Sequence, residues 1–143
     1  MSDRIKYFLI GTIFWIVVDF TTTKAVKNPA LYYSKYMPAL LIFYIGFPLL
    51  FSLLIYKYKM SDRRIFASTI AEAFVVEIVF THNPLLYTFP IMILAIPITI
   101  SLYSLIVFTP KWIVEGTVSA NKRKLIVMLV VWMLVSLANI FGK

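Results

Sequence analysis

Residues 37–56 read MPALLIFYIGFPLLFSLLIY, a run of twenty residues without a charged side chain. A helix of about 20 apolar residues is long enough to cross the hydrocarbon core of a bilayer. The rest of the chain has the same character, because 62% of its 143 residues are hydrophobic and only 14% are charged. A soluble domain averages roughly 45–50% apolar and about 25% charged residues. The sequence therefore predicts an all-α, polytopic membrane protein with one transmembrane domain, residues 1–143.

Four other apolar segments accompany this run, at residues 7–20, 65–80, 85–108 and 125–141. The second and third of these cannot form one straight helix, because at about 1.5 Å per residue it would reach roughly twice the thickness of the hydrocarbon core. Pro84 disfavours the helical conformation at Asn83, so the break is expected there. Five transmembrane helices follow. The first is expected to stay uncleaved, because the TTTK sequence after it lacks a small-residue cleavage site.

The basic residues predict the orientation of these helices. Ten of the fourteen Lys and Arg residues fall in the N-terminus and in the connections 57–64 and 111–124. The other four are Lys24, Lys27, Lys35 and Lys143. Because cytoplasmic loops carry the excess of Lys and Arg, the N-terminus is predicted to be cytoplasmic and the C-terminus outside the cell membrane. The same placement attributes the net charge of +8 to lipid headgroups, and no nucleic-acid partner is expected.

Two short motifs occur twice in the same order. Met-Ser-Asp-Arg stands at residues 1–4 and 60–63, and Asn-Pro-x-Leu-Tyr stands at residues 28–32 and 83–87. This order predicts two tandem two-helix hairpins in the same orientation, followed by a helix without a counterpart. The expected units are a first hairpin (1–59), a second hairpin (60–111), and a cytoplasmic linker with the fifth helix (112–143).

The repeated motifs are typical helix starts. Ser is a good N-cap, and Asn followed by Pro begins a helix with a cap and a pre-set first turn. Residues 109–116 are expected to form a separate amphipathic segment on the membrane surface that ends at Gly116. Pro48, Pro90 and Pro97 are expected to lie inside spans, where simple kinks are commoner than binding sites. Most tyrosines are interpreted as anchors at the membrane interface.

Glu72 lies near the middle of an apolar segment, and this makes it the first candidate site. An acid at that depth costs on the order of 3 kcal/mol on insertion scales, so it is a functional candidate by default. It would bind a proton or a cation, or else stay protonated and donate one hydrogen bond to a neighbouring helix. Glu77 follows five residues later, roughly 140° around an α-helix, so the two acids are not expected to share a face. Small residues at Ala67, Thr69, Ala71 and Ala73 predict that this helix is the most enclosed one.

Asp19, Glu77 and His82 are further candidates for ion or proton binding, at a similar depth near the outer interface. One His and two acids could form a polar pocket or a metal site. A lone His in a loop is more often solvated, so no metal ion is predicted. No cofactor is predicted either.

Three functions are compatible with these features. Cys is absent, and motifs typical of nucleotide, serine-hydrolase or zinc-protease sites are missing, so the chain is not expected to be an enzyme. The first expectation is a non-catalytic subunit or scaffold, in contact with the lipid bilayer and with other membrane subunits or a second copy of itself. The alternative is a small proton- or cation-coupled transporter or channel that uses Glu72. The third is an intramembrane enzyme that acts on lipid through Asp19, Glu77 and His82.

Overall fold

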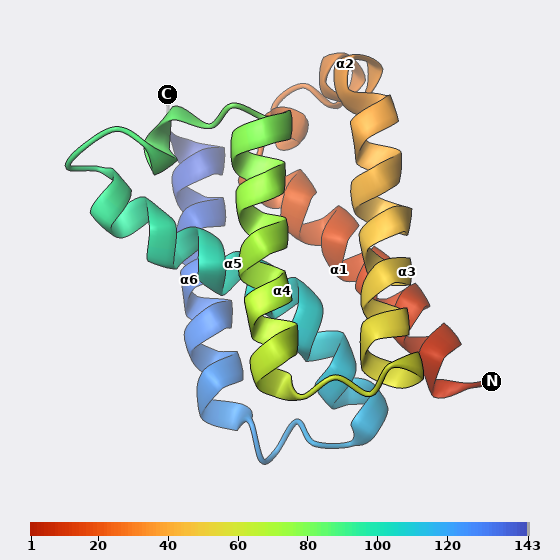
Figure 1. The fold of residues 1–143 in the computed structure, drawn as a ribbon. Helices are drawn as coiled ribbons and strands as arrows, with labels where there is room; N and C mark the ends of the chain where they lie inside the picture. Colours follow the sequence, from red (N-terminus) through yellow and green to blue (C-terminus); the bar gives the residue numbers. More distant parts are fainter. Residues whose placement is uncertain (143) are drawn as a thin grey trace.

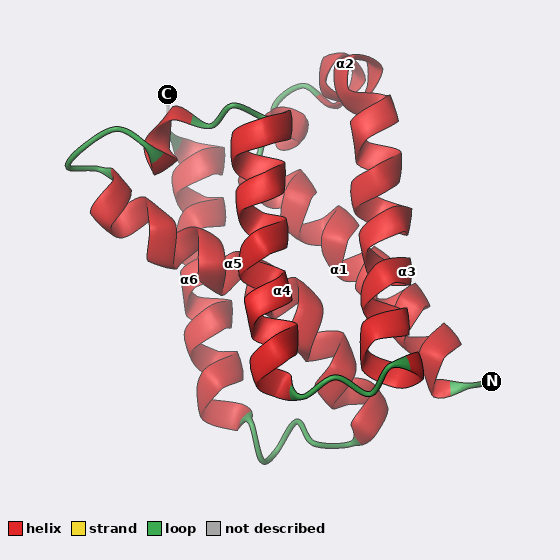
Figure 2. Cartoon of the chain, in the orientation of Figure 1, coloured by secondary structure: helices red, strands yellow, loops and turns green. Residues whose placement is uncertain are grey.

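Helices supply all the regular structure in a computed structural model that describes residues 1–142 (Figures 1 and 2). Lys143, counted above among the outer basic residues, lies outside the described residues. The α-helices are α1 (Asp3–Thr22), α2 (Pro29–Leu41), α3 (Phe47–Ser52), α4 (Asp62–Phe74), α5 (Met92–Glu115) and α6 (Lys122–Phe141). Wider π-helical turns are η2 (Ile42–Gly46), η3 (Leu53–Lys57) and η4 (Val75–Phe80), and the 3-10 turns are η1 (Lys24–Val26) and η5 (Pro84–Leu86). The predicted all-α class is confirmed.

Within residues 1–142, four helices are long and apolar enough to cross a membrane. They are Asp3–Thr22, Pro29–Lys57, Met92–Glu115 and Lys122–Phe141. The second joins α2, η2, α3 and η3 into one helix. The helix made by α4 and η4 packs in the same bundle but carries both glutamates and a charged start, so its composition does not place it among the four.

The connections between helices gather at the two ends of the bundle (Figure 1). The N-terminus and the connections 58–61 and 116–121 lie at the lower end in this view. The connections 23–28 and 81–91 and the end of α6 lie at the upper end. Successive long helices therefore run in opposite directions.

The second half of α5 forms the centre of the bundle. Ten consecutive residues, Tyr103 to Trp112, are buried on every side of the helix. Helices α1, α4 and α6 all pack on α5, which explains this complete burial. The most enclosed segment is therefore in α5, and the expectation that the 65–80 helix is the most enclosed is wrong.

The same observation corrects the prediction for residues 109–116. They do not form a separate surface segment, because α5 continues to Glu115 and Thr109 to Trp112 are part of its buried face. The expected end at Gly116 is confirmed, since Gly116 adopts a left-handed conformation with φ 67°. The division expected after residue 111 falls inside this continuous helix.

Helix starts in the first half of the chain match the predicted caps. The Ser2 side chain accepts a hydrogen bond from the Ile5 backbone at 3.4 Å. The Asn28 side chain accepts one from the Leu31 backbone at 3.2 Å, and Pro29 occupies the first turn of α2.

The second half of the chain uses the same motifs differently. Ser61 precedes α4 but makes no side-chain cap, and only its carbonyl accepts from Ile65, at 2.9 Å. Asn83 caps only the single 3-10 turn η5, at 3.1 Å to the Leu85 backbone nitrogen. Helix α5 begins later, at Met92, so Pro90 precedes the helix instead of lying inside it.

Helix α6, which has no counterpart in the predicted repeat, is attached to α1 by a polar cluster. The side chains of Trp132 and Ser136 donate to the Thr21 hydroxyl at 2.8 and 3.1 Å. The Asn139 amide donates to the carbonyls of Thr21 and Thr23 at 3.0 and 2.7 Å. Because residues 132, 136 and 139 share one face of a helix, the cluster fixes which side of α6 meets α1.

Only one of the two small-residue pairs on α4 faces the bundle. Thr69 and Ala73 are buried, whereas Ala67 and Ala71 are exposed. The buried pair shares the face of Glu72 and lies on the side that meets α5.

Candidate functional site

Pro48 explains why the long helix 29–57 has a wide turn at its centre. Proline lacks the backbone N–H that an α-helix needs, and the carbonyl four residues earlier loses its partner. The π turn η2 directly precedes this proline region, and the Phe47 N–H reaches back to the Ile42 carbonyl, five residues earlier. Tyr44 lies in this turn. The prediction of a kink at Pro48 thus corresponds to a π turn that holds a site residue.

Asp19 on α1 accepts hydrogen bonds from two tyrosine hydroxyls. The Tyr44 hydroxyl donates to Asp19 Oδ2 at 2.5 Å. The Tyr32 hydroxyl lies 3.0 Å from Oδ1 and 2.8 Å from Oδ2. This carboxyl group ties α1 to both parts of the 29–57 helix.

Glu77 on η4 has the same kind of environment. The Tyr103 hydroxyl donates to Oε1 at 2.9 Å, and the Asn83 amide donates to Oε2 at 2.8 Å. The Asn83 amide oxygen also accepts from the Leu85 backbone at the start of η5, so one side chain both begins this turn and holds the acid. Glu77 and Asp19 are close enough for their charges to interact.

Glu72 differs from both. Its side chain lies on the buried face of α4, and the residue is only 4% exposed. Both carboxyl oxygens are enclosed, and neither has a hydrogen-bond partner in the part of the chain that the structure describes. The Trp15 indole lies beside the carboxyl but outside hydrogen-bond geometry.

Aromatic rings enclose this acid. Trp15 is 4% exposed and stacks on Phe43, with ring centroids 5.8 Å apart. The Tyr103 ring meets Trp15 edge-on at 5.4 Å, and Tyr103 is close enough to Glu72 to interact with its charge. Glu72 therefore occupies an apolar, aromatic environment at the junction of α1, α4 and α5.

Both glutamates lie near Tyr103, although the sequence placed them on different faces. Tyr103 lies within electrostatic range of Glu72, and its hydroxyl donates a hydrogen bond to Glu77. The expectation assumed regular α-helical geometry. Residues five apart come onto one side when the helix widens to i→i+5 hydrogen bonding, and η4 begins between the two acids at Val75.

His82 does not join the acids. It is exposed, it has a positive φ of 49°, and its backbone carbonyl accepts from the Tyr87 hydroxyl at 3.2 Å. Among residues 1–142, no group of three His, Cys, Asp or Glu side chains is arranged to hold a metal ion. Of the four predicted site residues, Glu77 binds Tyr103, Glu72 and Asp19 lie within electrostatic range of the same tyrosine, and His82 lies apart.

Sequence reasoning missed the tyrosines that bind the acids. Tyr32 was interpreted as an interface anchor, and Tyr44 and Tyr103 were not singled out. One signal was available: Tyr44 follows Asp19 by 25 residues, and Tyr103 follows Glu77 by 26. An acid and a tyrosine at corresponding depths of two antiparallel helices can meet, and this spacing occurs in both halves.

Comparisons with protein-family models, curated proteins and solved structures find no match to this chain.

Proposed function

We propose that this chain is a five-span cell-membrane protein that binds a proton or a small cation at Glu72, as a small coupled transporter or channel. The observation that carries the proposal is the enclosed Glu72 carboxyl without a hydrogen-bond partner. Buried polar groups in proteins are nearly always paired, and an unpaired one calls for an explanation. An ionisable residue inside a membrane domain is a functional candidate by default.

The other acids strengthen this reasoning. Asp19 and Glu77 each receive two donors, so the chain supplies partners where an acid has a structural role. The sequence left open a structural role for Glu72, in which its protonated carboxyl would donate one hydrogen bond to a neighbouring helix. Within residues 1–142, the carboxyl makes no such hydrogen bond. A carboxyl without competing partners is free to take a proton or to serve as a cation ligand.

The two acid–tyrosine pairs support the proposed hairpin repeat. Asp19–Tyr44 and Glu77–Tyr103 join the first and second helices of their own hairpins. Their positions differ by the offset between the two Met-Ser-Asp-Arg motifs, to within one residue. In the proposed mechanism, occupation of Glu72 changes how the second hairpin packs against α1 and so couples binding to a rocking of the hairpins.

The arrangement of the connections supports the proposed topology. The N-terminus and the connections 58–61 and 116–121 lie at one end of the bundle (Figure 1). Ten of the fourteen Lys and Arg residues lie in or beside these regions, at residues 4–6, 57–64 and 111–124, so this end is proposed to be cytoplasmic and the C-terminus to be outside.

Ion flux in proteoliposomes tests the proposal. The purified chain would be reconstituted under imposed H⁺, Na⁺ or K⁺ gradients, and flux would be compared with that of Glu72→Gln, which keeps the side-chain shape but removes the titratable group. Asp3→Asn makes the same chemical change at an exposed position and is the matched control. We expect loss of flux only in Glu72→Gln. Equal flux in all three proteins would overturn the assignment.

A non-catalytic subunit of a membrane complex is the second candidate. It is favoured by α6, which is mostly exposed and whose exposed side chains include Met133, Leu134 and Leu137. Gentle extraction from native membranes followed by a mass measurement distinguishes the two. A partner in fixed ratio would support the subunit, whereas a chain found alone or as a homodimer would support transport.

A further inference from the structure

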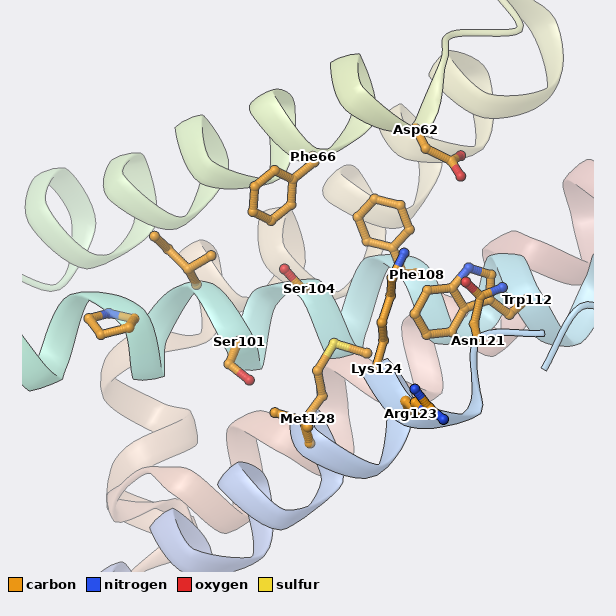
Figure 3. Close-up of a pocket in the computed structure, with 13 residues that line it drawn as sticks. Asp62, Phe66, Ser101, Ser104, Phe108, Trp112, Asn121, Arg123, Lys124 and Met128 are labelled. Carbon is orange, nitrogen blue, oxygen red and sulfur yellow. The ribbon is translucent and has the colours of Figure 1, made fainter. Parts of the chain in front are cut away.

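A cavity of about 690 Å³ lies between α4 and α6, with α5 as its floor (Figure 3). It is separate from the acid cluster, since none of Asp19, Glu72 or Glu77 lines it. Its volume falls within the range of about 300–1,000 Å³ that is typical of ligand pockets. Helices α4 and α6 both pack on α5, and the cavity occupies the space left between them.

The cavity has an apolar body and a polar end. Phe66 from α4, Ile100 and Phe108 from α5, and Met128 from α6 supply apolar walls. At the end nearest the start of α6, the lining changes to Asn121, Arg123 and Lys124 (Figure 3). This end lies at the same side of the bundle as the N-terminus, where the headgroups of one leaflet are proposed to lie.

The polar end carries unneutralised positive charge. Asp62 also lines it, but Lys111 lies 3.1 Å from Asp62 and 2.7 Å from Glu115 and offsets one of these two negative charges, so with Arg123 and Lys124 the charge of this end remains positive. Among residues 1–142, neither Arg123 nor Lys124 has an acidic side chain within ion-pair distance. Both are exposed, and they are available to an anion at the mouth of the cavity.

Two hydroxyls on the floor are also without partners. Ser104 is 7% exposed, its Oγ is enclosed, and it makes no hydrogen bond within the described residues. Ser101 Oγ, one turn earlier on α5, is in the same situation. Both residues line the cavity, and because their Oγ atoms are enclosed, a change of side-chain rotamer would be needed for either to donate to an oxygen atom deeper than the basic end.

These features point to one kind of ligand, and we propose that the cavity binds an anionic phospholipid. Its phosphate would contact Arg123 and Lys124, the oxygens of its glycerol backbone would accept from Ser104, and a hydrocarbon chain would lie along Phe66 and Met128. Basic residues at the headgroup level beside a groove between spanning helices are the expected features of such a site. This site does not depend on ion binding at Glu72.

Retention of a defined lipid tests the proposal. The purified full chain in detergent would be titrated with dioleoylphosphatidylglycerol, and bound lipid would be counted by native mass spectrometry. We expect one retained lipid per chain. The double variant Arg123→Gln, Lys124→Gln should bind about thirtyfold more weakly, because each basic residue near an anionic headgroup is worth roughly one kcal/mol.

Lys122→Gln is the matched control for charge. Lys122 is exposed and adjacent in sequence, but it does not line this cavity. The Lys122→Gln variant should bind the lipid as tightly as the unchanged chain does. If Lys122→Gln alone weakens binding as much as the double variant, the attraction belongs to the whole basic surface and the proposal is wrong.

Three further measurements identify what fills the cavity. Equal retention of dioleoylphosphatidylcholine would mean an unselective lipid shell. Displacement of the lipid by inorganic phosphate at millimolar concentration would mean a free-anion site. A protein subunit retained in place of lipid would mean that a partner helix fills the groove. Each of these results overturns the anionic-lipid site.

Trp112 gives a second measurement, because it lines the cavity and its fluorescence reports a nearby chain. Phosphatidylglycerol with brominated chains should quench the emission of the unchanged protein. Most of that quenching should disappear in Trp112→Phe, which leaves Trp15 and Trp132 as a background. Quenching that is the same in both proteins would contradict a chain lying in this cavity.

Discussion

Asp19 and Glu72 are two carboxyl groups inside the same helix bundle, but they differ in their hydrogen bonding. Asp19 is half-buried and receives hydrogen bonds from two tyrosine hydroxyls at 2.5–3.0 Å. Glu72 is more deeply buried and receives none within the described residues. Depth alone therefore does not decide whether an acid is supplied with partners.

The difference separates the structural role of an acid from a functional one. Removing a paired acid leaves its donors buried and unsatisfied, which costs the full desolvation of those donors. Removing an unpaired acid leaves nothing unsatisfied and takes a desolvated group out of the core. Stability measurements on the two sites should therefore give opposite signs.

The largest effect is expected at Asp19. Asp19→Leu would leave the hydroxyls of Tyr32 and Tyr44 without their acceptor, and we expect a loss of about 3 kcal/mol in the free energy of unfolding. The thermal midpoint of the purified protein in detergent measures this. Asp19→Asn keeps an acceptor oxygen and should lose less. Equal losses in the two variants would show that the hydrogen bonds to Tyr32 and Tyr44 do not account for the effect.

A smaller loss is expected from a single donor. Tyr44→Phe removes one hydroxyl and keeps the ring, while Tyr32 still binds Asp19, so we expect a loss of about 1 kcal/mol. Tyr103→Phe makes the equivalent change at Glu77, where Asn83 remains. If the two acid–tyrosine pairs are equivalent, the two variants should shift the thermal midpoint by similar amounts. A loss confined to one of them would count against the repeat.

The docking of α6 provides a comparison away from the acids. Asn139→Ala removes two hydrogen bonds to the carbonyls of Thr21 and Thr23, and we expect a cost of about 1–2 kcal/mol by thermal unfolding in detergent. Asn121→Ala is the control, because among residues 1–142 its amide donates only to the nearby Thr117 carbonyl. A loss in Asn139→Ala no larger than in the control would mean that α6 is held by its apolar contacts instead.

Helices and their caps were predictable where local chemistry decides them. Residues 29–57 form a long apolar helix that begins at Asn28-Pro29, as the sequence indicated, because the cap and the fixed proline conformation act within a few residues. The end of α5 at Gly116 followed from the same kind of local signal. Glu72 was identified as a candidate because a buried acid in an apolar segment is conspicuous in any sequence.

What escaped prediction depends on tertiary packing. The length of α5 was underestimated because Pro110 and Lys111 resemble a loop, yet Lys111 is held by Asp62 and Glu115 and the helix continues. The position of both Glu72 and Glu77 near Tyr103 was not predicted, because a π turn changes the angle per residue and hydropathy contains no signal for it. The tyrosine partners of the acids were missed because a phenol suits an interface as well as it suits a carboxylate.

The smallest effect, with the opposite sign, is expected at Glu72. Glu72→Leu removes a carboxyl that is 4% exposed and unpaired, so no donor is left unsatisfied. We expect the thermal midpoint to stay the same or to rise, with a gain of up to about 1 kcal/mol, because replacing a desolvated polar group by an apolar one of similar size is often stabilising. Glu72→Gln is the control, since it keeps the polar group and should gain less. A clear loss of stability in Glu72→Leu would mean that the carboxyl has a structural partner, and Glu72 would then belong with Asp19.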